Sequence, residues 1–243
     1  NDGTFNGSFS RFTSDISNTL FDAYLKFDDD ITDDISLRGT VGYSYQEFSN
    51  QSFSTGETRE EAQVDDSDVT TLPDVILIGY IGRAFVSFKD KYIASYSIRR
   101  DGSSRFAEGN KWGTFQSAAL SWNISDENFL KDSEVVSNLK LRASYGETGQ
   151  QEIGPRIIGL ESFTTSQPTA QVILGGAPTT AGFPIARNED LTWETAKTFN
   201  IGIDYGLFNG RITGTIDAYT RDTEDLFVVA PVPEGSNFTN TIE

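Results

Sequence analysis

Cysteine and histidine are both absent from the 243-residue sequence. Without cysteine the chain can form neither a disulfide framework nor a thiolate metal site. Without histidine it cannot build imidazole zinc sites or Ser-His and Cys-His catalytic pairs, and it lacks the side chain that most often senses physiological pH. These absences exclude the commonest metal centres and hydrolytic sites, and we expect no cofactor.

Methionine is absent as well, and the sequence opens on Asn1 without the basic and apolar regions of a signal peptide. We expect that a signal has been removed or that the chain is an internal segment. No apolar run approaches the about 18 residues of a transmembrane helix. The densest run, Val75–Ile81, is interrupted by Gly79. This excludes a helical membrane protein but not a membrane β-barrel, because only every second residue of a barrel strand faces lipid.

Basic residues are scarce, with 19 against 36 acidic residues and a net charge of -17. So acidic a chain is not expected to bind nucleic acid, which needs a basic footprint. The aspartates of Asp28–Asp34 lack the glycine and final glutamate of a calcium loop, so a solvated turn is the better interpretation. Carboxylate pairs of the glycosidase kind are plentiful, but none is marked by an apolar pocket or by spacing. We therefore predict that the protein is not an enzyme.

Strict alternation of apolar and polar residues is the dominant pattern, and it is clearest over Asp90–Ile124. There Tyr92, Ala94, Tyr96 and Ile98 alternate with small polar residues, and a second strand follows after a glycine-bearing loop. Period-2 alternation over such lengths predicts β-strands. Besides the two strands in this stretch, the same pattern predicts strands over Asn18–Asp28, Ile35–Phe48, Ile78–Lys89, Asn138–Gly146, Lys197–Tyr205 and Arg211–Arg221. The fold class is therefore all-β, with an Asn209-Gly210 hairpin near the end.

The predicted connections alternate between short and long. The short ones are Asp29–Asp34, Lys89–Lys91, Ile124–Ser137 and Leu207–Gly210, and the long ones are Ser49–Leu77, Asp101–Trp112, Glu147–Ala196 and the chain from Asp222 onward. Aromatic residues of the apolar faces gather near both ends of the strands. Short turns, long outer loops and two aromatic girdles are typical of an antiparallel transmembrane β-barrel.

Several motifs in this framework resemble the SusC/RagA family of TonB-dependent outer-membrane transporters. They are Gly42–Phe48, Gly82-Arg83 leading to Lys89–Tyr92, Arg100-Asp101-Gly102-Ser103-Ser104-Arg105-Phe106, Trp112-Gly113, Phe129–Lys131, Leu139–Gly146, Leu191–Thr195 and Phe199–Gly202. The resemblance covers nearly the whole chain from about Leu20, and the Arg-Asp-Gly-Ser-Ser-Arg-Phe motif is its most specific part.

The resemblance implies a 22-stranded barrel closed by a plug, of which residues 1–243 would supply about eight strands, with the plug and the terminal strands outside this chain. It also implies the outer membrane of a Gram-negative bacterium, with outer-membrane lipids around the barrel and the long loops extracellular. A SusD-like surface lipoprotein would act as a lid, and the TonB–ExbB–ExbD complex would supply energy. The cargo would be an oligosaccharide or a peptide.

Two sets of residues are candidate sites. Trp193, Phe163 and Phe183 lie in or beside the longest outer loop, where aromatic rings suit sugar binding or pack on neighbouring loops. Arg38, Arg99, Lys140 and Arg142 project to the lumen side, where we expect them to pair with carboxylates of the plug. The Asp101–Phe106 loop either touches substrate or is an ordered outer turn in which Asp101 and Arg105 satisfy each other or the backbone.

Two alternatives to a transporter segment stay open. A complete eight-stranded barrel with a structural or adhesion role would have its interior filled by side chains. It requires the last strand to close on the first. A soluble carbohydrate-binding β-sandwich requires apolar faces that pack on each other.

Overall fold

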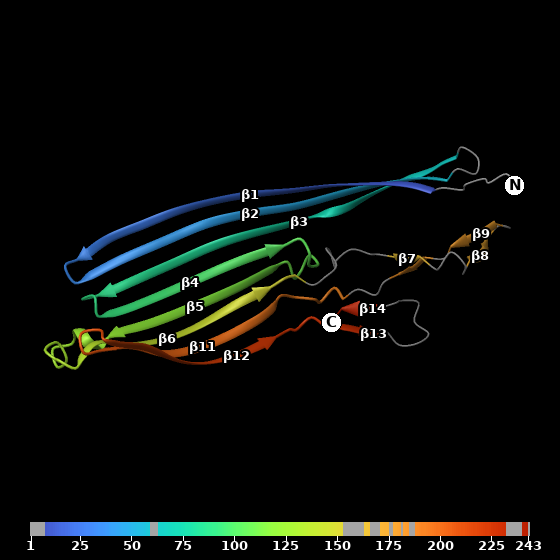
Figure 1. The fold of residues 1–243 in the computed structure, drawn as a ribbon. Helices are drawn as coiled ribbons and strands as arrows, with labels where there is room; N and C mark the ends of the chain where they lie inside the picture. The colour runs from blue at the N-terminus through green and yellow to red at the C-terminus, as the bar shows by residue number, and fades with distance from the viewer. Residues whose placement is uncertain are drawn as a thin grey trace.

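Eight long antiparallel strands form one sheet, in the order β1-β2-β3-β4-β5-β6-β11-β12 (Figure 1). The computed structural model describes residues 8–58, 63–152, 163–165, 171–174, 177–180, 182–184, 188–231 and 240–242. The long strands are β1 (Ser8–Thr32), β2 (Ile35–Thr58), β3 (Gln63–Phe88), β4 (Tyr92–Ser103), β5 (Trp112–Asn123), β6 (Val136–Gln150), β11 (Glu194–Leu207) and β12 (Ile212–Glu224). The prediction of an antiparallel all-β chain is confirmed.

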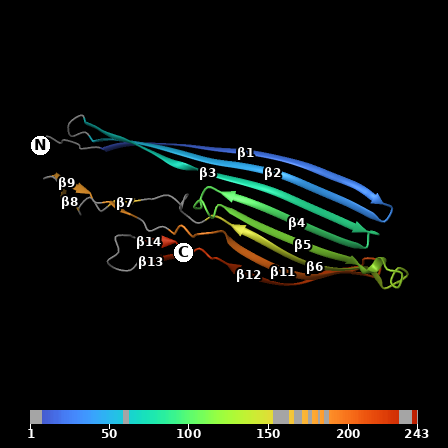
Figure 2. The same ribbon diagram turned by 180° about the vertical axis from the view of Figure 1, so that it is seen from behind.

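Three small sheets accompany the large one. They pair β7 (Phe163–Thr165) with β10 (Gly182–Pro184), β8 (Gln171–Leu174) with β9 (Ala177–Thr180), and β13 (Val229–Pro231) with β14 (Asn240–Ile242). They lie past one end of the shorter strands β4, β5, β6, β11 and β12 (Figure 2). Among the described residues, no helix is long and apolar enough to cross a membrane.

The first three strands are far longer than the alternation predicts. They hold 25, 24 and 26 residues, and β1 pairs with β2 continuously from Ser8↔Thr58 to the turn after Thr32. The prediction that Ser49–Leu77 is a long loop is therefore wrong for its described residues, which belong to β2 and β3, and residues 59–62 lie outside the described residues. Beyond the alternating part of these strands the sequence is mostly polar. Paired strands still satisfy their backbone groups there, but apolar alternation no longer reveals them.

The longest predicted loop, Glu147–Ala196, is also shortened by strands at both ends. β6 continues to Gln150, and β11 begins at Glu194. About half of the segment between them lies outside the described residues, as do the start of the chain before Ser8 and the Pro233 and Asn237 positions near its end.

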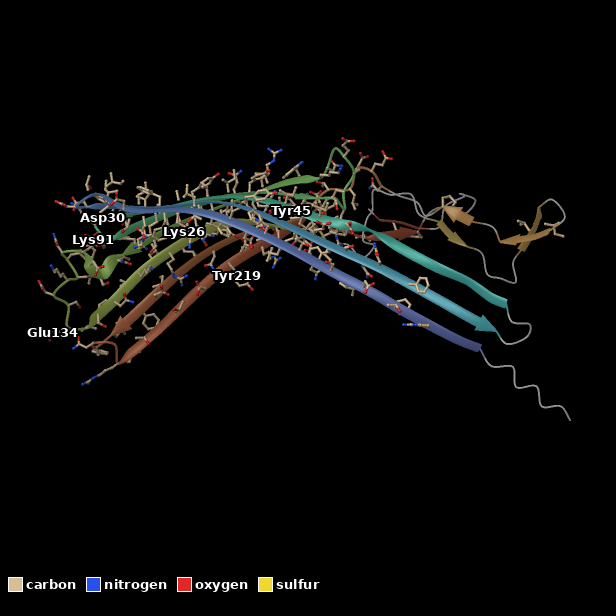
Figure 3. All side chains as sticks on the ribbon, turned by 90° about the horizontal axis from the view of Figure 1, so that it is seen from above. Lys26, Asp30, Tyr45, Lys91, Glu134 and Tyr219 are labelled. Carbon is tan, nitrogen blue, oxygen red and sulfur yellow. The ribbon has the colours of Figure 1, made fainter. Side chains whose placement is uncertain are left out.

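The short connections all lie at one end of the sheet, as predicted. Figure 3 shows Asp30, Lys91 and Glu134 at this end, with Tyr45 well removed from them. Lys89 and Asp90 both have positive φ, and the N–H of Lys91 donates to the carbonyl of Phe88 at 3.1 Å, which closes a tight hairpin. The connection after β5 begins with a short 3₁₀ helix, η1 (Ile124–Asp126), whose N-cap is Asn123.

One face of the large sheet is apolar and the other is polar. The antiparallel register aligns the apolar face over the seven strands from β2 to β12, as in the line Ile35, Phe88, Tyr92, Trp122, Leu141, Ile203 and Ile216. Among the described residues nothing packs over this face, and Leu120 in its middle is 65% exposed. The β-sandwich alternative is therefore wrong, because it needs a second sheet against these residues.

The described strands do not close on themselves. β1 and β12 stand at opposite ends of the strand order and are not hydrogen-bonded neighbours (Figure 1). An eight-stranded barrel requires that pairing, so this alternative also fails. The sheet is a curved segment with two free edges.

Candidate functional site

Two rows of aromatic rings cross the apolar face. At the short-turn end, the ring centroids of Phe88 and Tyr92 are 6.2 Å apart, and those of Tyr92 and Trp122 are 6.1 Å apart. Near the other end, Tyr80 lies between Tyr43 at 5.4 Å and Trp112 at 6.0 Å. Tyr80 and Phe88 are eight residues apart on β3, about 26 Å along an extended strand. This separation matches the apolar band of an outer-membrane barrel, about 25 Å tall.

The apolar band runs obliquely across the strands. It is centred near Ile216 on β12 and near Leu25 on β1. The register line from Ile216 reaches β1 at Thr32, seven residues beyond Leu25. A drift of about 23 Å over seven strand steps, which together span about 34 Å, corresponds to a strand tilt of about 35°. Barrel strands in outer membranes tilt by this amount.

The polar face carries ion pairs formed within the sheet. Arg38 Nε lies 3.2 Å from the carboxylate of Asp28, and Arg99 Nε lies 2.7 Å from that of Asp101. Arg142 contacts Asp204 at 2.9 Å and Asp217 at 3.2 Å. Lys140 stands opposite Asp204 in the register. All four predicted cations thus lie on the polar face, and the three arginines have partners within the sheet.

A hollow of about 480 Å³ opens on the polar face near the long-loop end. Side-chain amides and charged groups line it together with the rings of Phe115 and Trp193. The polar lining consists of Ser44, Gln46, Arg83, Ser97, Arg99, Asp101, Gln116, Ser117, Glu147, Thr148, Gln150 and Gln151. Hydrogen-bonding groups beside aromatic rings suit a polar cargo such as a peptide or a sugar.

The comparisons with known proteins agree with this geometry. Residues 1–242 match the family described as TonB dependent receptor-like, beta-barrel. The chain belongs to the TonB-dependent receptor family. It is 37% identical to TonB-dependent receptor SusC of Bacteroides thetaiotaomicron over 240 residues, which cover 96% of this chain and 24% of that protein. It is 35% identical to TonB-dependent receptor P3 of Formosa agariphila over 244 residues, which cover 93% of the chain and 23% of the relative.

Solved structures show the same fold. The structure of the RagAB peptide transporter superposes with a TM-score of 0.84 at 23% identity, over all of this chain and 27% of the solved chain. The predicted resemblance to SusC/RagA proteins is confirmed. The chain spans about a quarter of the length of the curated relatives it matches. A barrel of the TonB-dependent receptor family lies in the outer membrane of a Gram-negative bacterium.

The receptor's Arg-Asp-Gly-Ser-Ser-Arg-Phe motif ties neighbouring strands together. The Ser104 N–H donates to the carbonyl of Ile76, and the Ile76 N–H donates to Ser104 Oγ, both at 2.9 Å. Ser103 Oγ donates to the side chain of Gln151 at 3.1 Å. Asp101 pairs with Arg99 rather than with Arg105, so that part of the prediction is wrong. Arg99 lies two residues away on the same strand face, where its side chain reaches Asp101 directly.

Phe106, the last residue of the motif, anchors a small hydrophobic core at the long-loop end. Its ring centroid lies 5.4 Å from that of Trp193, and Phe115 meets Trp193 edge-on at 5.5 Å. Leu191 is buried in the same cluster, and Phe227 packs against it. The core joins the β4–β5 loop to the segments before β11 and after β12, and thereby closes this end of the described sheet.

The predicted aromatic cargo platform is not brought together as one exposed surface. Trp193 is only 6% exposed, and its Nε1–H donates to the carbonyl of Lys111 at 3.2 Å. Phe163 and Phe183 lie on the paired strands β7 and β10, with Phe183 opposite Thr164 and Phe163 opposite Pro184. Their side chains lie outside what the structure describes. The cargo role of these three residues stays a prediction.

Arg83 is a candidate that the sequence interpretation missed. It lies on the polar face, is exposed and lines the hollow. Its position after Gly82 draws attention to the backbone rather than to the guanidinium. The alternation of residues along the strand could have identified it. Gly82 and Ala84 lie on the apolar face, so Arg83 between them must lie on the polar face.

Proposed function

We propose that the protein containing this chain is an active importer of oligosaccharides or peptides across the outer membrane. The observation that carries the proposal is a membrane-spanning sheet whose polar face holds an amide-rich hollow at the long-loop end. A barrel with this inner surface surrounds a passage for polar cargo. In this proposal residues 1–243 form part of a single barrel domain, with a plug elsewhere in the protein.

The proposed partners follow from the relatives. The chain is similar to SusC and to the RagAB peptide transporter. Structures of the RagAB importer are known in closed-closed and open-open states. We infer that a SusD-like lipoprotein covers the long-loop end of this protein as a lid. The TonB–ExbB–ExbD complex then delivers energy from the opposite side.

Loops and the polar face have separate roles in this proposal. The long loops, with Trp193, Phe163 and Phe183, contribute to cargo and lid contacts. Arg38, Arg99, Lys140 and Arg142 shape the inner wall and meet plug carboxylates at its surface. Supporting this assignment, all four cations lie on the polar face, and the described lining of the hollow includes Arg99 and Trp193.

Orientation is tested by labelling single cysteines in intact cells. The chain contains no cysteine, so Gly109→Cys on the β4–β5 loop and Asp132→Cys on the β5–β6 connection are unambiguous within it. A membrane-impermeant maleimide is expected to label Gly109→Cys in whole cells and Asp132→Cys only after the outer membrane is opened. The reverse pattern rejects extracellular long loops.

Transport is tested by shortening the β2–β3 hairpin. Deleting residues 52–70 removes its distal part, and we expect uptake of labelled cargo and co-purification of the lipoprotein to fall in a barrel that still resists heat in detergent. Unchanged uptake and unchanged co-purification reject a role for this hairpin. A natural protein that is soluble without detergent rejects the importer altogether.

A further inference from the structure

The charged groups that line the hollow are not equivalent. Asp101 is held by Arg99, whose Nε lies 2.7 Å from both carboxylate oxygens. Glu147 accepts hydrogen bonds from the Tyr145 hydroxyl at 2.8 Å and from the Gln116 N–H at 3.2 Å. Arg83 has no hydrogen bond or ion pair within the part of the chain that the structure describes. It is therefore the cation of this lining that is available to a ligand.

The surroundings of Arg83 suit a planar anion. Thr40 on β2 and Ser97 on β4 pair with Arg83 in the register, and Ser117 on β5 pairs with Ser97. These side chains are short, so they leave space around the guanidinium, and their hydroxyls are additional donors. An arginine fork matches the two oxygens of a carboxylate in a bidentate arrangement. Asp101 on the polar face is already engaged by Arg99, and Glu147 alternates onto the opposite face with Tyr145, so neither competes for it.

We propose that Arg83 is a cargo-binding residue that holds a carboxylate group inside the barrel. The inference deepens the proposed import function and rests on it. Arg83 lies three residues from Tyr80 and five from Phe88, about 10 Å and about 17 Å along β3, and is therefore nearer the long-loop end. The hollow leads from Arg83 to Gln151 and Trp193 at that end. Cargo that enters between the long loops meets Arg83 before it reaches the short-turn half of the wall.

The negative net charge of the chain explains why an unpaired cation at this position would matter for acidic cargo. At -17, the chain repels acidic cargo, and the three other arginines discussed above are neutralised by aspartates within the sheet. A free guanidinium in the wall offsets this repulsion locally. Arg83 thus selects carboxylate-bearing peptides or acidic sugars over their neutral counterparts.

The first test measures binding by the purified full-length protein. The probes are an oligopeptide mixture with free carboxylates and the same mixture after methyl esterification, together with oligogalacturonate and a neutral oligosaccharide of equal length. Arg83→Gln is expected to weaken binding of the carboxylate forms roughly tenfold and to leave the neutral forms unchanged. Arg83→Lys keeps the positive charge but lacks the two-pronged guanidinium. Its affinity for the carboxylate forms is expected to lie between those of the parent and Arg83→Gln.

Lys26→Gln is the matched control. Lys26 pairs with Thr40, which in turn pairs with Arg83, so it shares the face and the register line but lies outside the lining of the hollow. Equal losses in Lys26→Gln and Arg83→Gln overturn the proposal, because they show only a general field effect. Retained binding in Arg83→Gln with a new ion leak in the absence of cargo also overturns it. That result would assign Arg83 to the plug.

A second measurement does not depend on transport. Phenylglyoxal modifies accessible arginines, and peptide mass analysis reports the reaction at Arg83. Succinate is expected to protect Arg83 several-fold and to leave exposed arginines outside the hollow, such as Arg211, unprotected. Absence of protection refutes the carboxylate site. Protection in a protein that imports none of the probes refutes the proposed function and leaves the site standing.

Discussion

Arg142 on β6 forms two hydrogen bonds to the carboxylate of Asp204 on the neighbouring strand β11. Its Nε and Nη2 donate to the two carboxylate oxygens at 2.9 and 3.0 Å, and Nη2 also reaches Asp217 on β12 at 3.2 Å. Bidentate arginine–carboxylate pairs fix geometry as well as charge. The pair therefore joins three consecutive strands on the inner wall.

Removing the Arg142–Asp204 ion pair is expected to destabilise that part of the barrel. Arg142→Gln should lower the temperature at which the full-length barrel unfolds in detergent by a few degrees. Arg142→Lys should recover only part of the loss, because an ammonium group lacks the fork. The heat-dependent mobility shift on a gel measures both. An Arg142→Gln barrel as heat-resistant as the parent would show that the pair contributes no stability.

The membrane face is tested by placing a charge on either side of β5. Leu120 lies in the apolar band and its neighbour Ala119 lies on the polar face. Leu120→Arg is expected to destabilise the folded barrel in lipid vesicles by about 2–4 kcal/mol, because the charge meets hydrocarbon. Ala119→Arg should cost far less. Urea unfolding in vesicles compares the two, and equal effects would contradict the assignment of faces.

The loop core depends on a missing side chain at Gly149. A Cβ at this position would overlap the ring of Phe115. Gly149→Ala is therefore expected to displace the ring and destabilise the core by about 1–3 kcal/mol. Gly109→Ala is the control, since nothing lies within 4 Å of its added Cβ. Limited proteolysis of the long loops provides the measurement, and equal cleavage rates in both variants would reject this packing.

Substituting Trp193 distinguishes a packing role of its ring in the loop core from a role in cargo binding. Trp193→Ala is expected to destabilise the loop core by about 3–5 kcal/mol and to speed proteolysis of the β4–β5 loop. Phe129→Ala, at a ring that is 70% exposed, should change neither. If Trp193→Ala instead leaves proteolysis unchanged and abolishes cargo binding, the ring is the platform that the sequence predicted.

Glu127 makes the short-turn end sensitive to acid. This carboxylate lies in the β5–β6 connection, outside the membrane-spanning segments. It accepts hydrogen bonds from the Tyr92 hydroxyl at 2.6 Å, Trp122 Nε1 at 3.2 Å and Lys91 Nζ at 3.2 Å. These bonds, that of Tyr92 first, lower the pKa of Glu127 below its ordinary value of 4.5. The charged form is thus the one that the fold stabilises.

The sign of the pH effect follows directly. A depressed carboxyl pKa contributes stability above the ordinary value of 4.5, and that stability is lost as the pH falls through the lowered pKa of the folded protein. The difference in unfolding midpoint between the parent and Glu127→Gln should therefore be constant near neutral pH and shrink in acid. Glu134→Gln, at an exposed site in the same connection, controls for the loss of one negative charge. A difference that stays constant down to low pH would contradict the prediction.

The membrane-spanning part of this fold could be predicted because its chemistry repeats every second residue. Tyr92, Ala94 and Ile98 must meet lipid while Ser95 and Ser97 must not, so alternation reveals the strands and their faces. The same rule failed for β1–β3 beyond the membrane. There Ser14 and Asn50 hydrogen-bond to each other at 3.2 Å on paired strands, but the sequence of these strand ends is mostly polar and does not alternate regularly.

The site was less predictable than the fold. The alternation of residues placed Arg99 and Arg142 on the polar face. It did not show that they form ion pairs with Asp101 and Asp204. Burial of Trp193 likewise depends on Phe106 and Phe115, which approach it from other segments. Such partners are far apart in the sequence, so local pattern gives no access to them.

Sequence patterns alone were enough to predict the all-β class, the two-faced strands, the sorting of short and long connections and the family. These follow from local alternation and from motifs that are read within a few residues. The three-dimensional arrangement was needed to show that the sheet stays open between β1 and β12, that a hollow forms beneath the loop core, and that Arg83 has no ion-pair partner among the described residues. These features depend on register across eight strands, which brings residues together that no short stretch of sequence contains.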